Sequence, residues 1–163
     1  MSGDTLRSLL GALADGPLAE AVAGRAKIFE MTAACERAHL MPSDPGGLGL
    51  AERAGLACRV ARLNAETALA EHYGALGAAS PDPDRAARIA DPAWAGEDAR
   101  MTALLRHADL VTARPRDATP EDIAALRDAG FEEADIVRLS GLLSFLAYQV
   151  RLLAGLRLVG AAS

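Results

Sequence analysis

One stretch of the chain places three side chains that can bind metal or do thiol chemistry close together. Cys35, Glu36 and His39 give C-x-x-x-H and E-x-x-H spacings, so on a helix they would lie within about one turn of each other. A protein metal site gathers about four donors, and the other histidines, His72 and His107, are distant in the sequence. No H-x-x-x-H pair completes the cluster, so we expect no bound metal.

The two cysteines offer thiol chemistry only in a restricted form. The chain has no C-x-x-C pair, so any pairing of Cys35 with Cys58 would depend on how two helices pack. In an open cleft, His39 could lower the pKa of the Cys35 thiol, and Arg59 or Arg62 could do the same for Cys58. Both cysteines fall on apolar faces, however, where a free thiol behaves as a small hydrophobic group. We expect both to be buried and inert, and keep them as candidate redox thiols.

Several function classes are disfavoured by missing patterns. No G-x-S-x-G elbow, Walker loop or G-x-G-x-x-G turn is present, so no cofactor is expected. The net charge of −5, without a basic stripe, disfavours a nucleic-acid partner. Two cysteines and no signal segment indicate a reduced, cytoplasmic protein. The longest uncharged apolar run, between Arg138 and Arg151, falls short of the ~20 residues that span a bilayer, so we expect no membrane partner.

The elements that position these residues are predicted to be helical throughout. The chain has 163 residues, enough for one domain with its own core. Hydrophobic residues make up 51% and aromatic residues only 4%, and alanine, the strongest helix former, is the most frequent residue. No alternating apolar and polar run resembles a strand. We therefore predict a single all-α domain over residues 1–163.

Capping residues, glycines and prolines indicate the helix boundaries. Asp4 is expected to cap the first helix, and Thr119 followed by Pro120 to begin a later one that ends at Gly130. Asn64 has poor helix propensity, which indicates a break or a local side-chain bond within a long helix. The predicted helices cover residues 6–14, 18–40, 51–78, 85–89, 97–112, 120–130 and 132–158, with loops at 41–50 and 80–83.

The last predicted helix is apolar on nearly every side between Leu139 and Leu153. A helix with apolar residues all round has to be buried, either in the centre of its domain or between subunits.

Two segments resemble a known family. Leu50–Asn64 is similar to the helix that precedes the active site in the carboxymuconolactone decarboxylase and AhpD-like alkylhydroperoxidase superfamily. Ala118–Gly130 carries a T-x-x-D-x-x-x-L-R-x-A-G pattern and is followed by an apolar segment, Phe145–Leu156, as in the C-terminal part of that superfamily. The resemblance covers about residues 20–160. It implies an AhpD-like helical domain that forms a homo-oligomer, as a dimer, trimer or hexamer.

The peroxidase members of this family carry E…C-x-x-C-x-x-x-H, in which two cysteines reduce the peroxide with help from the glutamate and histidine. Alignment on Asn64 places the two cysteine positions at Glu66 and Leu69, and the histidine and upstream glutamate positions at Tyr73 and Ala54. All four catalytic residues are replaced. Because no thiolate is available on this helix, the sequence predicts no thiol peroxidase activity of this type.

Three functional hypotheses follow from the resemblance. The first is a divergent family member associated with antioxidant peroxide metabolism, which acts beside a cysteine-bearing relative. The second is a non-redox enzyme of the decarboxylase kind that uses Glu66, Tyr73 or His72 in a small pocket. The third is a binding or assembly module without catalysis, in which Glu66 faces solvent and Tyr73 only packs its ring. Glu52 lies two residues from the aligned glutamate position and would serve there only if the alignment shifted.

Overall fold

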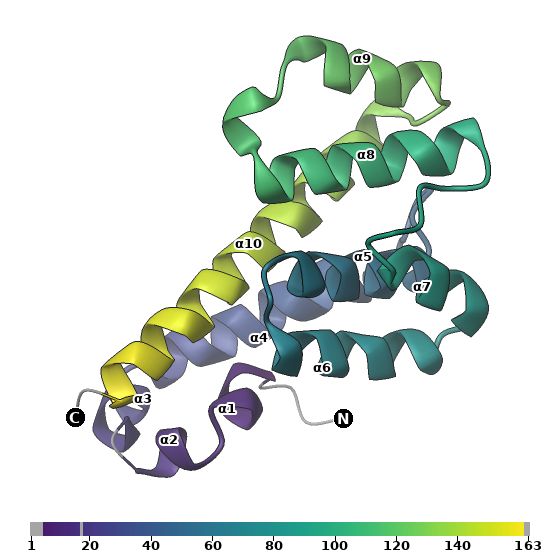
Figure 1. Cartoon of the computed structure of the whole chain (residues 1–163). Helices are drawn as coiled ribbons and strands as arrows, with labels where there is room; N and C mark the ends of the chain where they lie inside the picture. Colours follow the sequence, from purple (N-terminus) through teal and green to yellow (C-terminus); the bar gives the residue numbers. More distant parts are fainter. Residues whose placement is uncertain (1–4, 17, 162–163) are drawn as a thin grey trace.

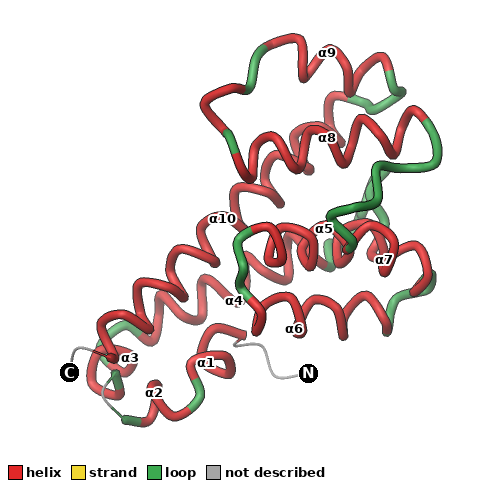
Figure 2. Tube along the Cα trace, viewed as in Figure 1, coloured by secondary structure: helices red, strands yellow, loops and turns green. Residues whose placement is uncertain are grey.

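Every regular element in the described part of the chain is helical, which confirms the all-α prediction. The computed structural model describes residues 5–16 and 18–161, and Figure 1 shows their arrangement. The helices are α1 (Thr5–Leu10), α2 (Ala12–Asp15), α3 (Ala19–Ala23), α4 (Ala26–Leu40), α5 (Leu50–Leu63), α6 (Thr67–Ala78), α7 (Pro83–Ala90), α8 (Ala99–Ala113), α9 (Pro120–Asp128) and α10 (Glu133–Ala161), with a 3₁₀ turn at Pro115–Asp117. Figure 2 shows short loops between them.

The longest helix, α10, connects the two ends of the molecule (Figure 1). Near its N-terminus it contacts α8 and α9, and towards its C-terminus it lies beside α4 and the short helix α1. Helices α5, α6 and α7 pack on one another, and α5 also contacts α10. Helix α10 therefore contacts helices from both ends of the described chain, while α6 and α7 pack mainly on α5.

The predicted start of α9 at Thr119 and the long last helix are confirmed, whereas the long helix predicted over 51–78 is not. Thr119 and Asp122 form the reciprocal capping box at the start of α9, and Gly130 has a φ of 88° just after its end. The predicted helix over 51–78 is wrong, because α5 ends at Leu63 and Ala65 adopts a φ of 55°. The side chain of Asn64 bonds the carbonyl of Val60 at 2.8 Å, which is the local bond expected of it.

The N-terminal region is divided more finely than predicted. The expected helix over 6–14 is interrupted at Gly11, which has a φ of 51°, and the one over 18–40 breaks at Gly24 and Arg25. The expected cap residue Asp4 lies outside the described residues.

Two fully buried arginines hold the loops around α5. Arg53 donates to the carbonyls of Leu48, His39 and Pro45 at 2.7–2.9 Å and so fixes the loop between α4 and α5. Arg59 forms a two-pronged ion pair with the carboxylate of Asp109, at 2.6 and 2.7 Å, and also donates to carbonyls of the α7–α8 loop. Helix α5 is thereby tied to loops on both sides.

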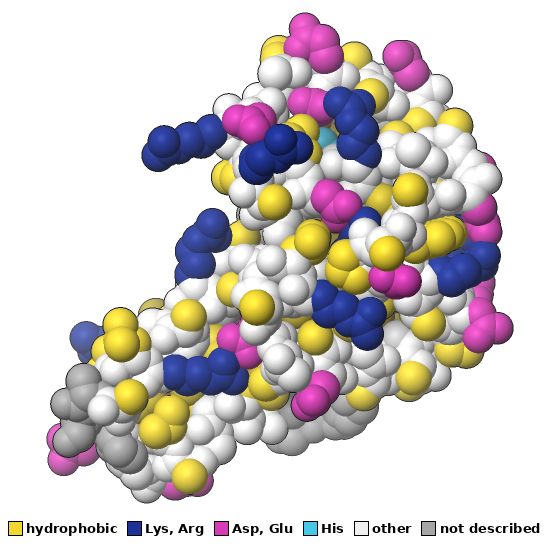
Figure 3. Space-filling model, in the orientation of Figure 1, with side chains coloured by type: hydrophobic (Ala, Val, Ile, Leu, Met, Phe, Trp, Pro, Cys, Tyr) yellow, Lys and Arg dark blue, Asp and Glu magenta, His cyan; other side chains and the backbone are white. Residues whose placement is uncertain are grey.

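The last helix is less buried than its sequence suggests. Leu139, Leu142, Leu146 and Leu153 are buried against the core, but Tyr148 on another side is 43% exposed. By length and composition alone α10 could cross a membrane, as many core helices of soluble proteins could. Figure 3 shows hydrophobic side chains at the surface over the C-terminal half of α10. The prediction of burial on every side is wrong within a single chain.

Candidate functional site

The helix face that the sequence resemblance would align with the family's catalytic thiols begins at Glu66, which immediately precedes α6. Its side chain is buried, and Arg157 Nη1 of α10 lies 2.7 Å from both carboxylate oxygens. The expectation that Glu66 faces solvent is wrong. The first aligned thiol position is therefore occupied by an ion pair that joins the start of α6 to the last turns of α10.

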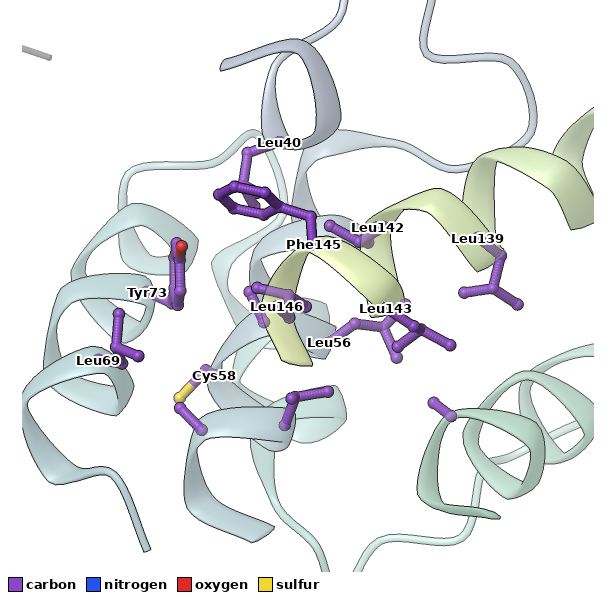
Figure 4. Packing of buried hydrophobic residues seen from close by; sticks show 14 of the residues in the cluster. Leu40, Leu56, Cys58, Leu69, Tyr73, Leu139, Leu142, Leu143, Phe145 and Leu146 are labelled. Atoms are coloured by element: carbon purple, nitrogen blue, oxygen red, sulfur yellow. The ribbon is translucent and has the colours of Figure 1, made fainter. Parts of the chain in front are cut away.

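The two other aligned positions lie in the core. Leu69 and Tyr73 are each 1% exposed. Figure 4 shows both on one side of α6, facing the packed residues of α10 and Cys58 of α5. Leu69 is closed off by this packing, whereas Tyr73 also borders a hollow of about 350 Å³ between α5, α6 and α7.

The hydroxyl of Tyr73 bonds to residues from two other helices. It lies 3.1 Å from Glu36 Oε1 of α4 and contacts the side-chain amide of Gln149 on α10. A phenol has one hydrogen to donate, and the carboxylate is the stronger acceptor. Gln149 is fully buried, and its amide satisfies this arrangement when its NH₂ group donates to the phenol oxygen. The phenol lies against Gln149 Oε1, and Gln149 Nε2 has no partner among the described residues. Exchanging the oxygen and nitrogen of this amide lets Tyr73 donate to Glu36 and accept from Gln149.

Glu36 is the centre of this polar group. Its Oε1 also accepts a hydrogen bond from the Thr5 hydroxyl at 2.9 Å and lies 3.4 Å from His72 Nε2. Thr5 and His72 are themselves 3.3 Å apart. We call Thr5, Glu36, His72, Tyr73 and Gln149 the Glu36 cluster. It joins α1, α4, α6 and α10, and the partly exposed His72 ring lies at its edge.

Burial and charge hold a proton in this cluster. Desolvation, followed by the nearby Glu36 carboxylate, raises the pKa of Tyr73 well above its ordinary value. The phenol is therefore protonated at neutral pH and acts as a hydrogen-bond donor. Chemically, the cluster combines a carboxylate, a proton-bearing phenol and an imidazole, which are groups that general acid–base catalysis uses.

The structure brings together only part of the predicted catalytic set. Tyr73 and His72 share the cluster, whereas Glu66 bonds to Arg157 outside it. The sequence pattern indicated Glu36 only as a candidate metal ligand and gave no indication of Gln149 or Thr5. A signal for Glu36 was present, because it follows Phe29 by seven residues and Ala33 by three, on the buried stripe of α4.

Glu52, the acidic residue near the aligned glutamate position, also forms ion pairs outside the Glu36 cluster. Glu52 Oε1 accepts from Arg85 and Arg100 at 2.8 Å each, so its carboxylate is part of an ion-pair group that links α5 with α7 and α8. It contributes nothing to the Glu36 cluster.

Cys58 is buried, as predicted, but lines a hollow of about 350 Å³ between α5, α6 and α7. Its thiol donates to the carbonyl of Ala70 at 3.2 Å. Burial raises the pKa of the Cys58 thiol, and this effect outweighs the opposite effect of Arg62. Arg59 gives no help, because its guanidinium is bound to Asp109. The thiol is thus held in its unreactive form.

Cys35 is exposed, which contradicts its predicted burial. Its side of α4 is uncovered within one chain and borders an open groove of about 550 Å³ along α10. The groove, which we call the α4–α10 groove, is lined by Ile28, Met31, Thr32, Cys35, His39, Gly141, Ser144, Phe145 and Tyr148. The His39 ring stacks on Phe145, and burial followed by the charge of Arg53 lowers its pKa. A neutral imidazole there gives no charge to stabilise a thiolate.

The two cysteines thus lie in different parts of the molecule. Cys35 lines the α4–α10 groove, and Cys58 lines the hollow between α5, α6 and α7. Neither forms a disulfide. Within residues 5–16 and 18–161, no three or more histidine, cysteine and acidic side chains gather closely enough to hold a metal ion.

Comparison with known proteins shows a likeness in fold and none in sequence family. No protein-family model and no curated protein sequence matches it. Among solved structures it is similar to an uncharacterized peroxidase-related protein from Silicibacter sp. TM1040, with a TM-score of 0.71 over 83% of this chain and 71% of that one. The two sequences are 22% identical. At that identity the likeness establishes the fold, and the chain has the helical fold of this peroxidase-related protein.

Proposed function

We propose that this protein is a divergent, AhpD-like member of the peroxidase-related helical proteins that does not reduce peroxides itself. It would contribute to antioxidant metabolism by assembling with other protein chains, either further copies of itself or a cysteine-bearing relative. The observation that supports this most strongly is the set of side chains on and just before α6 that stand in place of the thiols. The Glu66–Arg157 ion pair and the buried side chains of Leu69 and Tyr73 occupy the three positions where a thiol peroxidase needs its cysteines and histidine.

The remaining thiols support the same conclusion. Peroxide reduction begins with attack by a thiolate on the peroxide oxygen, and the resulting sulfenic acid is resolved by a second thiol. Cys58 is buried with a raised pKa, and Cys35 lies in a different place on the molecule. Neither cysteine has the arrangement that this reaction requires.

A peroxide-consumption assay tests the proposal directly. We expect the purified protein, with dithiothreitol and either hydrogen peroxide or an organic hydroperoxide, to consume peroxide no faster than free dithiothreitol. Cys35→Ser and Cys58→Ser should leave this background unchanged. Turnover that disappears in either variant would show that the protein is a thiol peroxidase.

The α4–α10 groove supports assembly with a second copy of the chain. Ile28, Met31 and Tyr148 are 48%, 55% and 43% exposed there, and none of the described residues that line the groove is a lysine, an arginine or an acidic residue. Each chain carries a net charge of −5, so an uncharged surface is where two copies approach with the least repulsion. A two-fold contact pairs a surface with itself, which an uncharged apolar surface satisfies.

Measurement of the mass in solution tests the assembly. We expect light scattering with size exclusion to give a multiple of the 16.9 kDa chain mass for the wild type. Met31→Glu places a charge in the groove and should yield monomers. Leu63→Glu, which alters an exposed leucine at the end of α5 and outside the groove, should keep the wild-type mass. A wild-type protein that is monomeric at micromolar concentration would exclude this part of the proposal.

A second candidate function is non-redox acid–base catalysis of the decarboxylase kind. The Glu36 cluster favours it, because a carboxylate, a phenol and the imidazole of His72 meet within 3.4 Å of Glu36 Oε1. A substrate would have to enter beside α1, which supplies Thr5. A thermal-shift screen of small carboxylic acids tests this function. A ligand that stabilises the wild type but not Glu36→Gln or His72→Gln would support it.

A further inference from the structure

An apolar hollow of about 150 Å³ lies at the end of the molecule opposite α8 and α9. It is formed where α1, α3, α4 and α10 meet. Its walls are side chains of Leu6, Val22, Ile28, Phe29, Leu152 and Leu156. Leu6, Val22 and Phe29 are buried, so the hollow belongs to the packed region and extends between helices.

The walls give water little to bond with. A water molecule in a protein cavity generally needs two to four polar partners. The hydroxyl of Thr32, which borders the hollow, lies 3.1 Å from the hydroxyl of Tyr148, with which it shares a hydrogen bond. Apolar cavities of this size in proteins stay dry and take up a compact apolar molecule such as benzene. The interior thus fits one ring or a chain of about six carbons.

The mouth of the hollow adds a positive charge. Arg25, between α3 and α4, borders the hollow through the carbon atoms of its side chain, and it is exposed, so that its guanidinium can turn towards the mouth. Its guanidinium makes one long hydrogen bond, to the carbonyl of Gly24 at 3.4 Å, and within the described residues no acidic side chain forms an ion pair with it. A planar guanidinium pairs well with a carboxylate through two parallel hydrogen bonds. The site therefore combines an apolar interior with an anion-binding rim.

We propose that this hollow binds a small monocarboxylic acid, with the ring or short alkyl body inside and the carboxylate on Arg25. The ligand class follows from volume, apolar walls and the charge at the mouth together. The site is separate from the aligned α6 positions, and it adjoins the α4–α10 groove, with which it shares Ile28 and Thr32. The proposal therefore stands or falls independently of peroxide chemistry, and repeating the ligand titration with Met31→Glu, a position that does not border the hollow, separates it from assembly.

Benzoate and its neutral analogue benzyl alcohol are the probes. Calorimetry with the full chain should give a dissociation constant for benzoate on the order of 1 mM, as expected for a ligand of this size. Arg25→Gln should weaken benzoate about tenfold and leave benzyl alcohol within about twofold, because only benzoate uses the guanidinium. Lys27→Gln removes a nearby exposed charge that does not border the hollow, and should change neither affinity.

Filling the hollow provides an independent test. Ala21 borders it from the exposed side of α3, so Ala21→Phe inserts a ring with little disturbance of the core and should abolish binding of both probes. Methyl NMR of the wild type should show benzoate-induced shifts at Val22, Leu152 and Leu156. Absence of binding at millimolar benzoate, or shifts confined to other regions, would overturn the proposal. Equal weakening by Arg25→Gln and Lys27→Gln would overturn the assigned role of Arg25.

Discussion

Replacing Tyr73 with phenylalanine would test the Glu36 cluster most directly, because it removes one oxygen atom from a side chain that is 1% exposed. The change leaves the ring packing intact but removes the bonds to Glu36 and Gln149. A hydrogen bond to a charged group contributes ~1.5–3 kcal/mol, and the buried Gln149 amide would also lose its partner. We therefore expect Tyr73→Phe to lower the free energy of unfolding by about 2–3 kcal/mol.

Thermal and urea unfolding would measure this loss. For a chain of this size, 2–3 kcal/mol corresponds to a fall in Tm of roughly 4–12 °C. Tyr148→Phe is the matched control, since its hydroxyl also bonds to a partner, Thr32 at 3.1 Å, but its side chain is 43% exposed. That variant should lose less than about 0.5 kcal/mol, because water replaces the lost bond. If Tyr73→Phe were no more destabilising than the control, the reasoning about the cluster would be refuted.

The raised pKa of Tyr73 also predicts that the free energy of unfolding depends on pH. Burial and the Glu36 carboxylate raise the folded-state pKa of Tyr73 above its ordinary value of 10.0. The stabilisation from the protonated phenol is therefore present below pH 10 and is lost as the pH rises from there towards the folded-state pKa. We expect the free energy of unfolding of the wild type to fall more steeply above about pH 10 than that of Tyr73→Phe, by at most ~1.4 kcal/mol per pH unit. Equal slopes in urea titrations would contradict this.

Three further predictions concern other parts of the site. Glu66→Gln should lower the free energy of unfolding by about 1–2 kcal/mol in urea, because it leaves the half-buried Arg157 without its partner; an unchanged midpoint would contradict the ion pair. An aromatic disulfide reagent should label Cys35 in the folded Met31→Glu monomer, where the α4–α10 groove is open, and Cys58 only after unfolding, as read by mass spectrometry; rapid labelling of Cys58 in the folded protein would refute its burial. Gly55→Ala should cost ~1–3 kcal/mol, since the added Cβ would lie 2.8 Å from Ala86 O, whereas Gly74→Ala meets only Cys58 Sγ at 3.8 Å and should be tolerated.

Local signals in the sequence predicted what depends on local chemistry. The capping box of Thr119 and Asp122 determines where α9 begins whatever the rest of the chain does, so the prediction held. Asn64 was recognised as unfavourable within a helix, but the left-handed conformation of Ala65 was not, because alanine rarely adopts it. The turn at this position depends on how α6 packs on α5, which sequence periodicity does not report.

The polar contacts of the candidate site were less predictable because they join residues far apart in the chain. Glu66 and Arg157 are separated by 91 positions, and Tyr73 and Gln149 by 76. Nothing local to α6 indicates which residue of α10 lies opposite. Cys35 was mispredicted for a different reason. Its apolar neighbours on α4 predict that it is buried, but no other part of the described chain covers it. Packing between helices decides both cases.

The position of α10 has a consequence for how the protein is made. This helix contacts α1, α4, α5, α8 and α9, all of which precede it in the chain. Until α10 leaves the ribosome, the apolar faces of the earlier helices lack the surface that they finally cover. The nascent chain therefore cannot complete this core before α10 is synthesised, so a stop codon before residue 133 would yield loosely associated helices and a substrate for proteases and chaperones.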